Sequence, residues 1–501
     1  MKKQLLLFIL TLLPMLAMAD DSGSCGENVT YTYNSTTKTL TIQGSGAMTN
    51  YNSSSDIPWY SYKNYIQTVI IEEGVTSIGW YAFSDCSSLT SVTIPNTVTR
   101  IGVSAFAGCS GLISFIIPNN VTSIGSSAFS GCSGLTSVTI PNGVTSITNS
   151  MFSGCSSLIS ITIGSGVTYI GSDAFYNCSG LQKVIVPDIA AWCAISFANN
   201  SDNPLYYAHH IYSDDNTEIK ELVITNKFTC IERYAFYGCF GLTSVTIGNS
   251  MTSIEKYAFD GCFGLTSVEF HCAQIGSWFK GMTSIKEVVI GNEVTSIGAR
   301  AFEGCSGVEK VVISDIAKWC SFVFGGYSDN PLYYAHHIYS DKNTEITEIV
   351  IPEGVNIIGQ YAFYNCENIT SVAIPSSVTS IGKNAFSCGI KLSTVNVNMN
   401  IPIEIDESVF EFTGENYSKD IIYLAATLNV PKGSKNLYSN VKGWKKFANI
   451  QEVDFSGVET IKQKSTPTSY YSVSGEKLNN VHRGVNIIRM SDGTTRKVVV
   501  K

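Results

Sequence analysis

Cysteine and histidine recur together at two places in this 501-residue chain. The segment SDNPLYYAHHIYSD occupies residues 201–214 and returns unchanged at residues 328–341, and each copy follows a Trp-Cys pair. Cysteine, asparagine and histidine are the residue types of a cysteine-protease site, in which a thiolate needs a nearby histidine and a group that orients it. The two candidate sets are Cys193, Asn203 and His209, and Cys320, Asn330 and His336.

A packing role competes with catalysis for these residues. The local signature around the catalytic cysteine of papain-like enzymes is missing from the sequence, and two active sites copied within one chain would be unusual. The adjacent histidines at 209–210 and 336–337 would point to opposite faces of an extended strand, so neither pair is predicted to chelate a metal. Metalloprotease, serine-hydrolase, phosphate-loop and dinucleotide-binding motifs do not occur in the sequence. We therefore predict loop packing, with no enzymatic activity, metal or cofactor.

These segments interrupt an internal repeat with a period of 23 residues. The unit reads V-T-S-I-G-x-x-A-F-x-G-C-S-x-L-T-S-V-T-I-P, and its phenylalanine marks twelve units: Phe83, Phe106, Phe129, Phe152, Phe175, Phe236, Phe259, Phe279, Phe302, Phe363, Phe386 and Phe410. Within a unit, L-x-x-V-x-I alternates like a strand with one buried face, and Pro or Gly ends it. A single unit cannot bury this face, whereas stacked units form a continuous core. The predicted fold is a β-rich solenoid of parallel strands, about 4.8 Å apart.

Ten of the fifteen cysteines follow the same period. They are Cys86, Cys109, Cys132, Cys155, Cys178, Cys239, Cys262, Cys305, Cys366 and, one place early, Cys388. Abundant cysteine in an exported protein usually indicates disulfides, but stacked equivalent residues direct their Cβ atoms in parallel, which disfavours a bridge. Zinc would need closely spaced ligand pairs, and no C-x-x-C occurs. We predict a ladder of buried free thiols, and we assign no pairing to Cys25, Cys193, Cys230, Cys272 and Cys320.

The repeat resembles the leucine-rich repeat of the BspA-like (Treponema-type) class. Its pattern is matched by Leu135, Val138, Ile140, Val144, Ile147, Phe152 and Cys155, and the resemblance covers roughly residues 70–410. It implies a leucine-rich-repeat solenoid, and leucine-rich repeats in general place Asn or Cys at this turn, facing inward. It also implies adhesion, because members attach bacteria to host matrix proteins or to other microbes.

The N-terminus predicts export. Two lysines, an apolar run over residues 5–13 and Ala-Met-Ala at 17–19 match a signal peptide of residues 1–19. A membrane anchor would need about 20 apolar residues, so this run is too short, and no later segment is apolar enough to span a membrane. Removing Lys2 and Lys3 takes the formal net charge from −8 to −10, which argues against nucleic-acid partners. We expect a secreted or outer-surface protein.

The remaining boundaries follow from composition and from the same resemblance. They are an N-terminal β-hairpin cap at 20–66, the repeats at 67–427 with insertions at about 187–224 and 314–351, a closing cap at 428–455, a linker at 456–469 and a small β-module at 470–501. The module resembles C-terminal domains of secreted Bacteroidetes proteins, and it is either a sorting signal or a structural tail. For each insertion we expect a compact excursion packed on the solenoid flank, with a helical turn at 188–193 and a hairpin near residue 215 in the first copy.

The residues that flank the buried strand positions offer a ligand surface on the expected concave side. In the early units these residues are Ser and Thr, which also suit a plain solvated strand. In later units they are charged or aliphatic, and the candidate contacts are Lys183, Ile185, Ser267, Glu269, Glu287, Lys310 and Glu348. A long array of this kind suits a protein partner. The insertion tyrosines Tyr206, Tyr207, Tyr333 and Tyr334 would suit a glycan. A protein-binding adhesin is the favoured function; a glycan-binding protein and a Cys–His enzyme are the alternatives.

Overall fold

The computed structural model describes residues 21–224, 228–412, 414, 418–455, 467–472, 477–478, 484–490 and 495–500. The predicted signal peptide and most of the predicted linker lie outside these residues. The chain divides into two compact units, Met1–Glu345 and Ile346–Lys501, called unit 1 and unit 2. No helix among the described residues combines the length and apolarity needed to cross a membrane.

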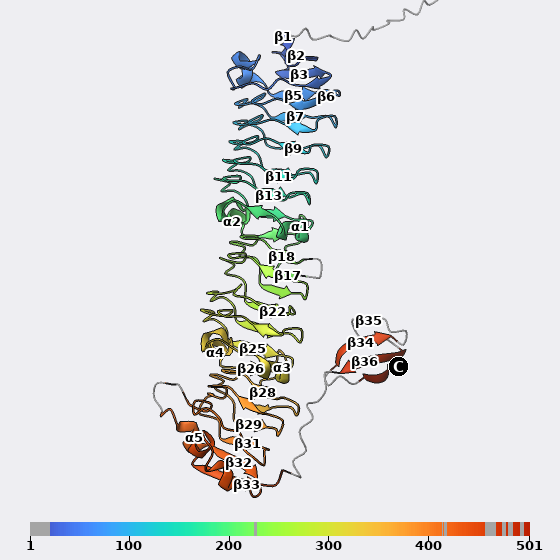
Figure 1. Cartoon of the computed structure of the whole chain (residues 1–501). Helices are drawn as coiled ribbons and strands as arrows, with labels where there is room; N and C mark the ends of the chain where they lie inside the picture. The colour runs from blue at the N-terminus through green and yellow to red at the C-terminus, as the bar shows by residue number, and fades with distance from the viewer. Residues whose placement is uncertain are drawn as a thin grey trace, which may run out of the picture. The chain divides into compact units, whose positions relative to one another are not determined.

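Unit 1 is a solenoid whose coils contain one longer and one shorter strand (Figure 1). The longer strands are β5 (Thr68–Ile71), β7 (Ser91–Thr93), β10 (Ser137–Thr139), β12 (Ser160–Thr162), β14 (Lys183–Ile185), β17 (Glu221–Ile224), β19 (Ser244–Ile247), β21 (Ser267–Phe270), β23 (Glu287–Ile290) and β25 (Lys310–Ile313). Where neighbours pair, they are parallel and in register, so Val138 lies opposite Ile161. Val138 is buried between exposed Ser137 and Thr139, which confirms the predicted alternation.

The shorter strands form a second face of the same coils. They are β6 (Val75–Ile78), β8 (Arg100–Ile101), β9 (Ser123–Ile124), β11 (Ser146–Ile147), β13 (Tyr169–Ile170), β18 (Cys230–Ile231), β20 (Ser253–Ile254), β22 (Gln274–Ile275) and β24 (Ser296–Ile297). Each ends on a buried isoleucine. The core of unit 1 therefore lies between two rows of parallel strands and the turns that join them.

The third side of each coil is a series of tight turns around the repeated Phe and Cys. All twelve marker phenylalanines are buried, and consecutive rings stack, as Phe129 does on Phe152 at a centroid distance of 5.6 Å. The residue before the cysteine has a positive φ: Gly131 is at +73°, and Asn177 takes the same place at +60°. Glycine adopts this conformation freely and asparagine tolerates it, which explains the G-C and N-C pairs of the repeat.

The predicted thiol ladder is confirmed. All fifteen cysteines lie among the described residues, all are free, and the ten of the repeat are buried. Most of these thiols donate to a carbonyl of the preceding coil: Cys132 Sγ donates to the Phe106 carbonyl at 3.2 Å, and Cys155 Sγ donates to the Phe129 carbonyl at 3.2 Å. Burial raises the pKa of the Cys132 thiol to about 12, so the ladder thiols are protonated core groups.

The N-terminal end of unit 1 is a small antiparallel sheet. It contains β1 (Asp21–Ser24), β2 (Val29–Asn34) and β3 (Thr39–Gly44), and β3 then pairs in parallel with β5. The short strand β4 (Gly46–Ala47) and the 3-10 helix η1 (Tyr60–Tyr65) follow. Trp59 is buried, stacks on Phe83 at 5.8 Å and donates from Nε1 to the Ala82 carbonyl at 2.8 Å. The indole therefore ends the column of phenylalanine rings.

The two insertions are coils of the solenoid, and the prediction of an excursion on its flank is wrong. The first contains α1 (Ile189–Cys193), β15 (Ser196–Phe197), η2 (Asn200–Asp202), α2 (Leu205–Ala208) and β16 (Ile211–Tyr212); the second contains α3 (Ile316–Ser321), η3 (Tyr327–Asp329), α4 (Leu332–Ala335) and β26 (Ile338–Tyr339). Strand β15 pairs with β13, and β16 pairs with β14. The cause is Trp192, which is buried and donates to the Ala235 carbonyl at 2.9 Å as Trp59 does to Ala82.

The predicted helical turn and hairpin of the insertion are confirmed. Asp188 caps α1 by accepting from the amides of Ala190 and Ala191 at 3.0 and 3.2 Å, which satisfies amides that a helix start leaves unpaired. Tyr212 and Glu218 form an antiparallel bridge around the turn at residues 214–217.

Unit 2 continues the repeat and contains a separate antiparallel sheet. Its parallel sheet is β27 (Glu348–Val350), β29 (Ser371–Ile374), β31 (Thr394–Val397), β32 (Thr427–Pro431) and β33 (Asn449–Val453), with β28 (Ile357–Ile358) paired to β30 (Ser380–Ile381). Helices α5 (Ile421–Ala425) and α6 (Lys435–Tyr438) and the 3-10 helix η4 (Trp444–Lys446) join its last strands. The antiparallel sheet has the order β35 (Lys477–Leu478), β34 (Pro467–Ser472), β36 (Gly484–Met490) and β37 (Thr495–Val500). Strand β34 begins at Pro467, inside the predicted linker.

Candidate functional site

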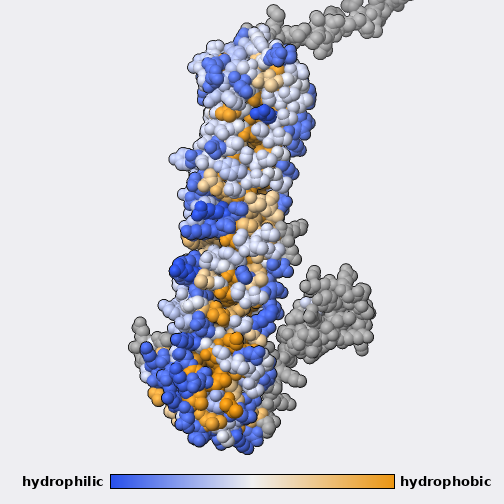
Figure 2. Space-filling model, viewed as in Figure 1, coloured by the Kyte–Doolittle hydropathy of each residue, from blue (hydrophilic) through white to orange (hydrophobic). Residues whose placement is uncertain are grey.

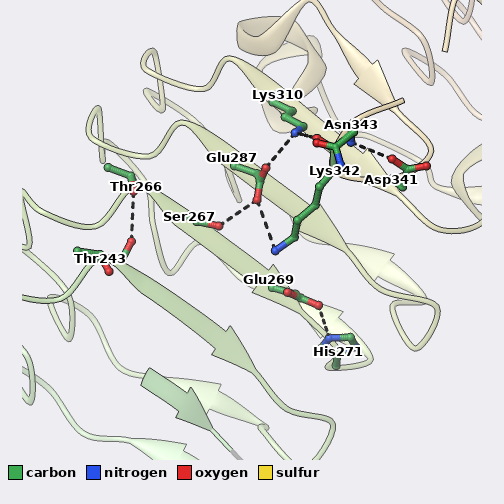
Figure 3. A network of polar contacts seen from close by, with 10 residues as sticks. All are labelled: Thr243, Thr266, Ser267, Glu269, His271, Glu287, Lys310, Asp341, Lys342 and Asn343. Atoms are coloured by element: carbon green, nitrogen blue, oxygen red, sulfur yellow. Dashed lines mark hydrogen bonds and ion pairs between the residues drawn. The ribbon is translucent and has the colours of Figure 1, made fainter. Parts of the chain in front are cut away.

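Three of the predicted ligand residues meet on the solvent side of the longer strands of unit 1, called the outer face. Ser267, Glu287 and Lys310 lie directly opposite one another on β21, β23 and β25 (Figure 3). Ser267 Oγ donates to Glu287 Oε1 at 3.3 Å, and Lys310 Nζ lies 3.2 Å from Glu287 Oε2. Opposite charges on facing strand positions stabilise each other, so Glu287 is the centre of a polar row across three coils.

A hairpin of the second insertion reaches this row. Lys310 Nζ donates to the carbonyl of Lys342 and lies 4.8 Å from the centroid of the Tyr339 ring. The Lys342 ammonium is 4.0 Å from Glu287 Oε1. Asp341 Oδ1 accepts from the amides of Asn343 and Thr344 at 2.8 and 2.9 Å, which holds the hairpin tip in a turn (Figure 3). Lys310 is therefore a brace between the strand and the hairpin.

A second charged group lies beside the row at the end of β21. His271 Nε2 is 2.8 Å from Glu269 Oε1, and His271 Nδ1 is 3.0 Å from Glu293 Oε2. The hydrogen bond to Glu269, helped by the one to Glu293, raises the pKa of His271 to about 9 against the opposing effect of burial. The same hydrogen bond lowers the pKa of Glu269. At neutral pH the group is a histidinium between two carboxylates.

The outer face changes its character along unit 1. The strands β7, β10 and β12 present only Ser and Thr at the flanking positions, whereas β21, β23 and β25 present Glu269, Glu287 and Lys310. Apolar side chains add to this surface at Val223 of β17, which is exposed, and Val289 of β23, which is half-buried. Figure 2 shows hydrophobic residues between hydrophilic ones along the visible face of unit 1.

Ile185 does not face solvent as predicted. Strand β16 pairs with β14 and places Tyr212 opposite Ile185, which is only 4% exposed. The prediction that Ile185 contacts a ligand is therefore wrong, because the insertion covers it. Lys183 Nζ donates to the Asp215 carbonyl at 2.6 Å and lies 4.9 Å from the Tyr212 ring centroid. Lys183 is the brace of the first hairpin, as Lys310 is of the second.

The four insertion tyrosines pack against other rings. Tyr206 is 42% exposed, and its ring stacks on the Tyr237 ring at a centroid distance of 6.3 Å. The rings of Tyr206 and Tyr207 contact each other edge to face at a centroid distance of 5.0 Å. Tyr333 contacts Tyr334 at a centroid distance of 4.8 Å, and the Tyr334 hydroxyl accepts from the Gly304 amide at 2.7 Å. These contacts involve the same aromatic rings on which a sugar would have to stack.

Glu348, the remaining predicted ligand residue, belongs to unit 2. It is exposed in β27 and lies opposite Ser371 of β29.

The structure does not assemble the cysteine-protease constellation in the first insertion. His209 Nδ1 is 2.9 Å from the Gly238 carbonyl oxygen, and its ring stacks on Phe240 at 4.0 Å. The Asn203 amide donates to the carbonyls of Tyr234 and Ala235. Cys193 is buried, and burial raises the pKa of its thiol to about 12, whereas a nucleophilic cysteine needs a lowered pKa. All three side chains serve packing and backbone bonding.

Sequence reasoning missed His271, Glu293 and Lys342. His271 lies two residues after Glu269, and the period of two along a strand predicts that both side chains share a face. The duplication places Lys342 at the hairpin position of Asp215 by the 127-residue offset, but it does not show that the side chain reaches β23. Glu293 comes from the turn after β23, and no local pattern connects it to His271.

Comparison with known proteins places this architecture in a family. The model of the BspA type leucine rich repeat region matches six copies over residues 51–201, 211–328 and 337–424. The chain belongs to this family of leucine-rich-repeat solenoids.

Solved structures of similar proteins include leucine-rich repeat proteins from Bacteroides ovatus and Eubacterium ventriosum. The first is 23% identical, with 74% of this chain and 94% of that chain covered and a TM-score of 0.36. The second is 22% identical, with 73% and 94% covered and a TM-score of 0.33. A leucine rich cell surface protein from Faecalibacterium prausnitzii is 24% identical, with 73% and 95% covered and a TM-score of 0.29. No curated protein matches the chain.

Proposed function

We propose that this chain is a secreted or surface-displayed adhesin that binds proteins of a host matrix or of other microbes. The contact surface is the outer face of β17–β25 in unit 1, with Ser267, Glu269, Glu287 and Lys310 near its centre. The observation that carries the proposal is the polar row through Glu287, since it breaks the Ser/Thr pattern of the earlier coils with charge at aligned positions.

The chemistry of this surface suits a protein partner. Charged groups arranged in a fixed pattern give specificity and a fast encounter with a complementary surface. Val223 and Val289 add apolar contact area beside the charged groups. A solenoid also presents many shallow contacts at once, so affinity arises from an extended surface instead of a single pocket. Membership of a family with surface-protein relatives supports the same role.

Glycan binding through the insertion tyrosines is the alternative function, and the ring contacts of these tyrosines favour it less than protein binding. Sugars stack on the open faces of aromatic rings, whereas Tyr206 stacks on Tyr237 and Tyr333 packs on Tyr334. A Cys–His enzyme is disfavoured by the engagement of His209 and Asn203 with backbone carbonyls.

The test is surface plasmon resonance with the chain from residue 20 onward over immobilised fibronectin, fibrinogen and microbial surface extract. We expect binding at micromolar concentration or tighter, weakened about tenfold or more by E287Q combined with E269Q, because central charged contacts carry a large share of interface energy. The matched control is S137A combined with T139A, which alters the same positions on the neutral strand β10.

Two outcomes would contradict the proposal. One is the absence of binding to any of these surfaces at micromolar concentration. The other is binding that survives E269Q/E287Q and disappears with Y206A/Y333A, which would support glycan capture.

A further inference from the structure

The two hairpins of unit 1 have the same internal design. Hairpin 1 comprises residues 210–218 and hairpin 2 comprises residues 337–345. The Ser213 amide donates to the Thr217 carbonyl at 2.9 Å in hairpin 1, and the Ser340 amide donates to the Thr344 carbonyl at 3.0 Å in hairpin 2. A histidine and a glutamate pair across each hairpin, at 2.6 Å for His210–Glu218 and 2.7 Å for His337–Glu345.

The hairpins differ in the contact between the tip and the outer face. In hairpin 2 the Lys342 side chain extends back past β25 to β23, where its ammonium lies 4.0 Å from Glu287 Oε1. It also helps to lower the pKa of Glu269 on β21. In hairpin 1 the residue equivalent to Lys342 is Asp215, and the residue equivalent to Glu287 is Ser160. The long-range charge pair is therefore specific to hairpin 2.

We propose that hairpin 2 is an ionic strap, which the Lys342–Glu287 pair closes over the charged outer face of β21–β25. The Lys310 brace donates to the Lys342 carbonyl at the tip, as Lys183 donates to the Asp215 carbonyl in hairpin 1, and the Lys342 side chain adds the pair with Glu287. The Lys342 side chain is 64% exposed, so its pair with Glu287 is weak and is screened by salt. The strap consequently opens when ionic strength rises or when another charged surface competes for Glu287.

The role of the strap as a gate on the ligand surface rests on the proposed function, because Glu287 is the central residue of both the strap and the proposed contact surface. A closed strap leaves Lys342 beside the carboxylate that a partner would contact, and an open strap releases it. The existence of the strap does not depend on any partner, so it is measured on the free protein.

Hydrogen exchange of the Ser340 and Ser213 amides tests the strap, with the full chain and electron-transfer fragmentation. Both serines follow a tyrosine, so their intrinsic exchange rates are alike and hairpin 1 is an internal reference. In low salt we expect K342Q to speed exchange at Ser340 roughly threefold, the size that a weak exposed ion pair allows. E287Q should do the same, K342R should not, and Ser213 should be unaffected by all three variants. In about 0.5 M salt the wild-type protein should approach K342Q, since the screening length falls to about 4 Å, close to the separation of the pair.

Transplanting the pair gives the reciprocal result. S160E combined with D215K should slow exchange at Ser213 roughly threefold in low salt, whereas D215K alone should not. The proposal is overturned if K342Q leaves Ser340 exchange unchanged in low salt, or if salt speeds exchange equally in both hairpins. Loss of binding with an intact strap would reject only the proposed function.

Discussion

Trp192 in the first insertion and Trp319 in the second are both buried, and each belongs to a helical turn that an aspartate caps. Above this shared base the insertions differ, because Lys342 of the second pairs with Glu287, whereas the equivalent residues of the first copy are Asp215 and Ser160. The buried parts and the lysine braces are the same in both copies, while the outer face and hairpin tip carry different charges. The comparison teaches that the repeat separates the core from the surface charge: the interior positions specify the coil, and the outer positions vary without altering it.

The largest expected effect comes from the part that the two copies share. Trp192→Ala and Trp319→Ala should each lower the free energy of unfolding of unit 1 by about 3–5 kcal/mol, as large-to-small core changes do. Urea unfolding followed by circular dichroism measures both. Trp80→Ala is the control, because Trp80 is 43% exposed and its loss should have little effect. A small effect at either insertion tryptophan would show that the copies do not share a core role.

A smaller effect is expected at the braces. Lys183→Met and Lys310→Met each remove a hydrogen bond to a hairpin carbonyl, and each should lower the free energy of unfolding by about 1 kcal/mol. The loss should be greater for Lys310→Met, because this change also removes the nearest cation from Glu287. The difference should shrink in high salt, where exposed ion pairs are screened. Equal losses at every salt concentration would mean that Glu287 adds nothing to the brace.

The smallest effect is the pH dependence that His271 adds at the charged end of the outer face. The pKa of His271 is raised to about 9 in the folded protein, above the ordinary value of about 6.5 for an unfolded chain. The folded state therefore holds a proton that the unfolded state releases, and this stabilisation is complete below pH 6.5 and is lost as the pH rises through 9. The urea midpoint of the wild type should fall towards that of H271Q between pH 6 and pH 9.5. If the urea midpoints of the wild type and H271Q differed by the same amount at every pH in this range, the role of His271 would be contradicted.

The repeat made most of the fold predictable. Spacing located the buried phenylalanines and cysteines, because each coil repeats one pattern and contacts chiefly its neighbours. The insertion was misplaced because nothing local shows that Trp192 enters the core and donates to the Ala235 carbonyl; that contact depends on how a longer coil closes. Ile185 was misjudged for the same reason, since a strand position is outward only until another segment covers it.

The candidate site was predictable in part. Ser267, Glu287 and Lys310 share one strand position in successive units, so their alignment follows from the period. The contacts of Lys342 and Glu293 join turns to strands, and turn geometry determines whether such side chains reach their partners. Distances of this kind depend on the folded coil and have no counterpart in the repeat pattern.

The sulfur atoms inside the coils set a condition on how the chain must fold. Once Cys132 donates to the Phe106 carbonyl in the core, its protonated thiol is a poor nucleophile towards oxidants and disulfides. Before the coils close, however, the same fifteen cysteines are accessible and reactive. In an oxidising compartment, coil closure and disulfide formation are therefore competing rates. Each coil stacks on its neighbour through contacts of short sequence separation, and folding of this kind is fast. It can therefore bury the thiols before disulfides form.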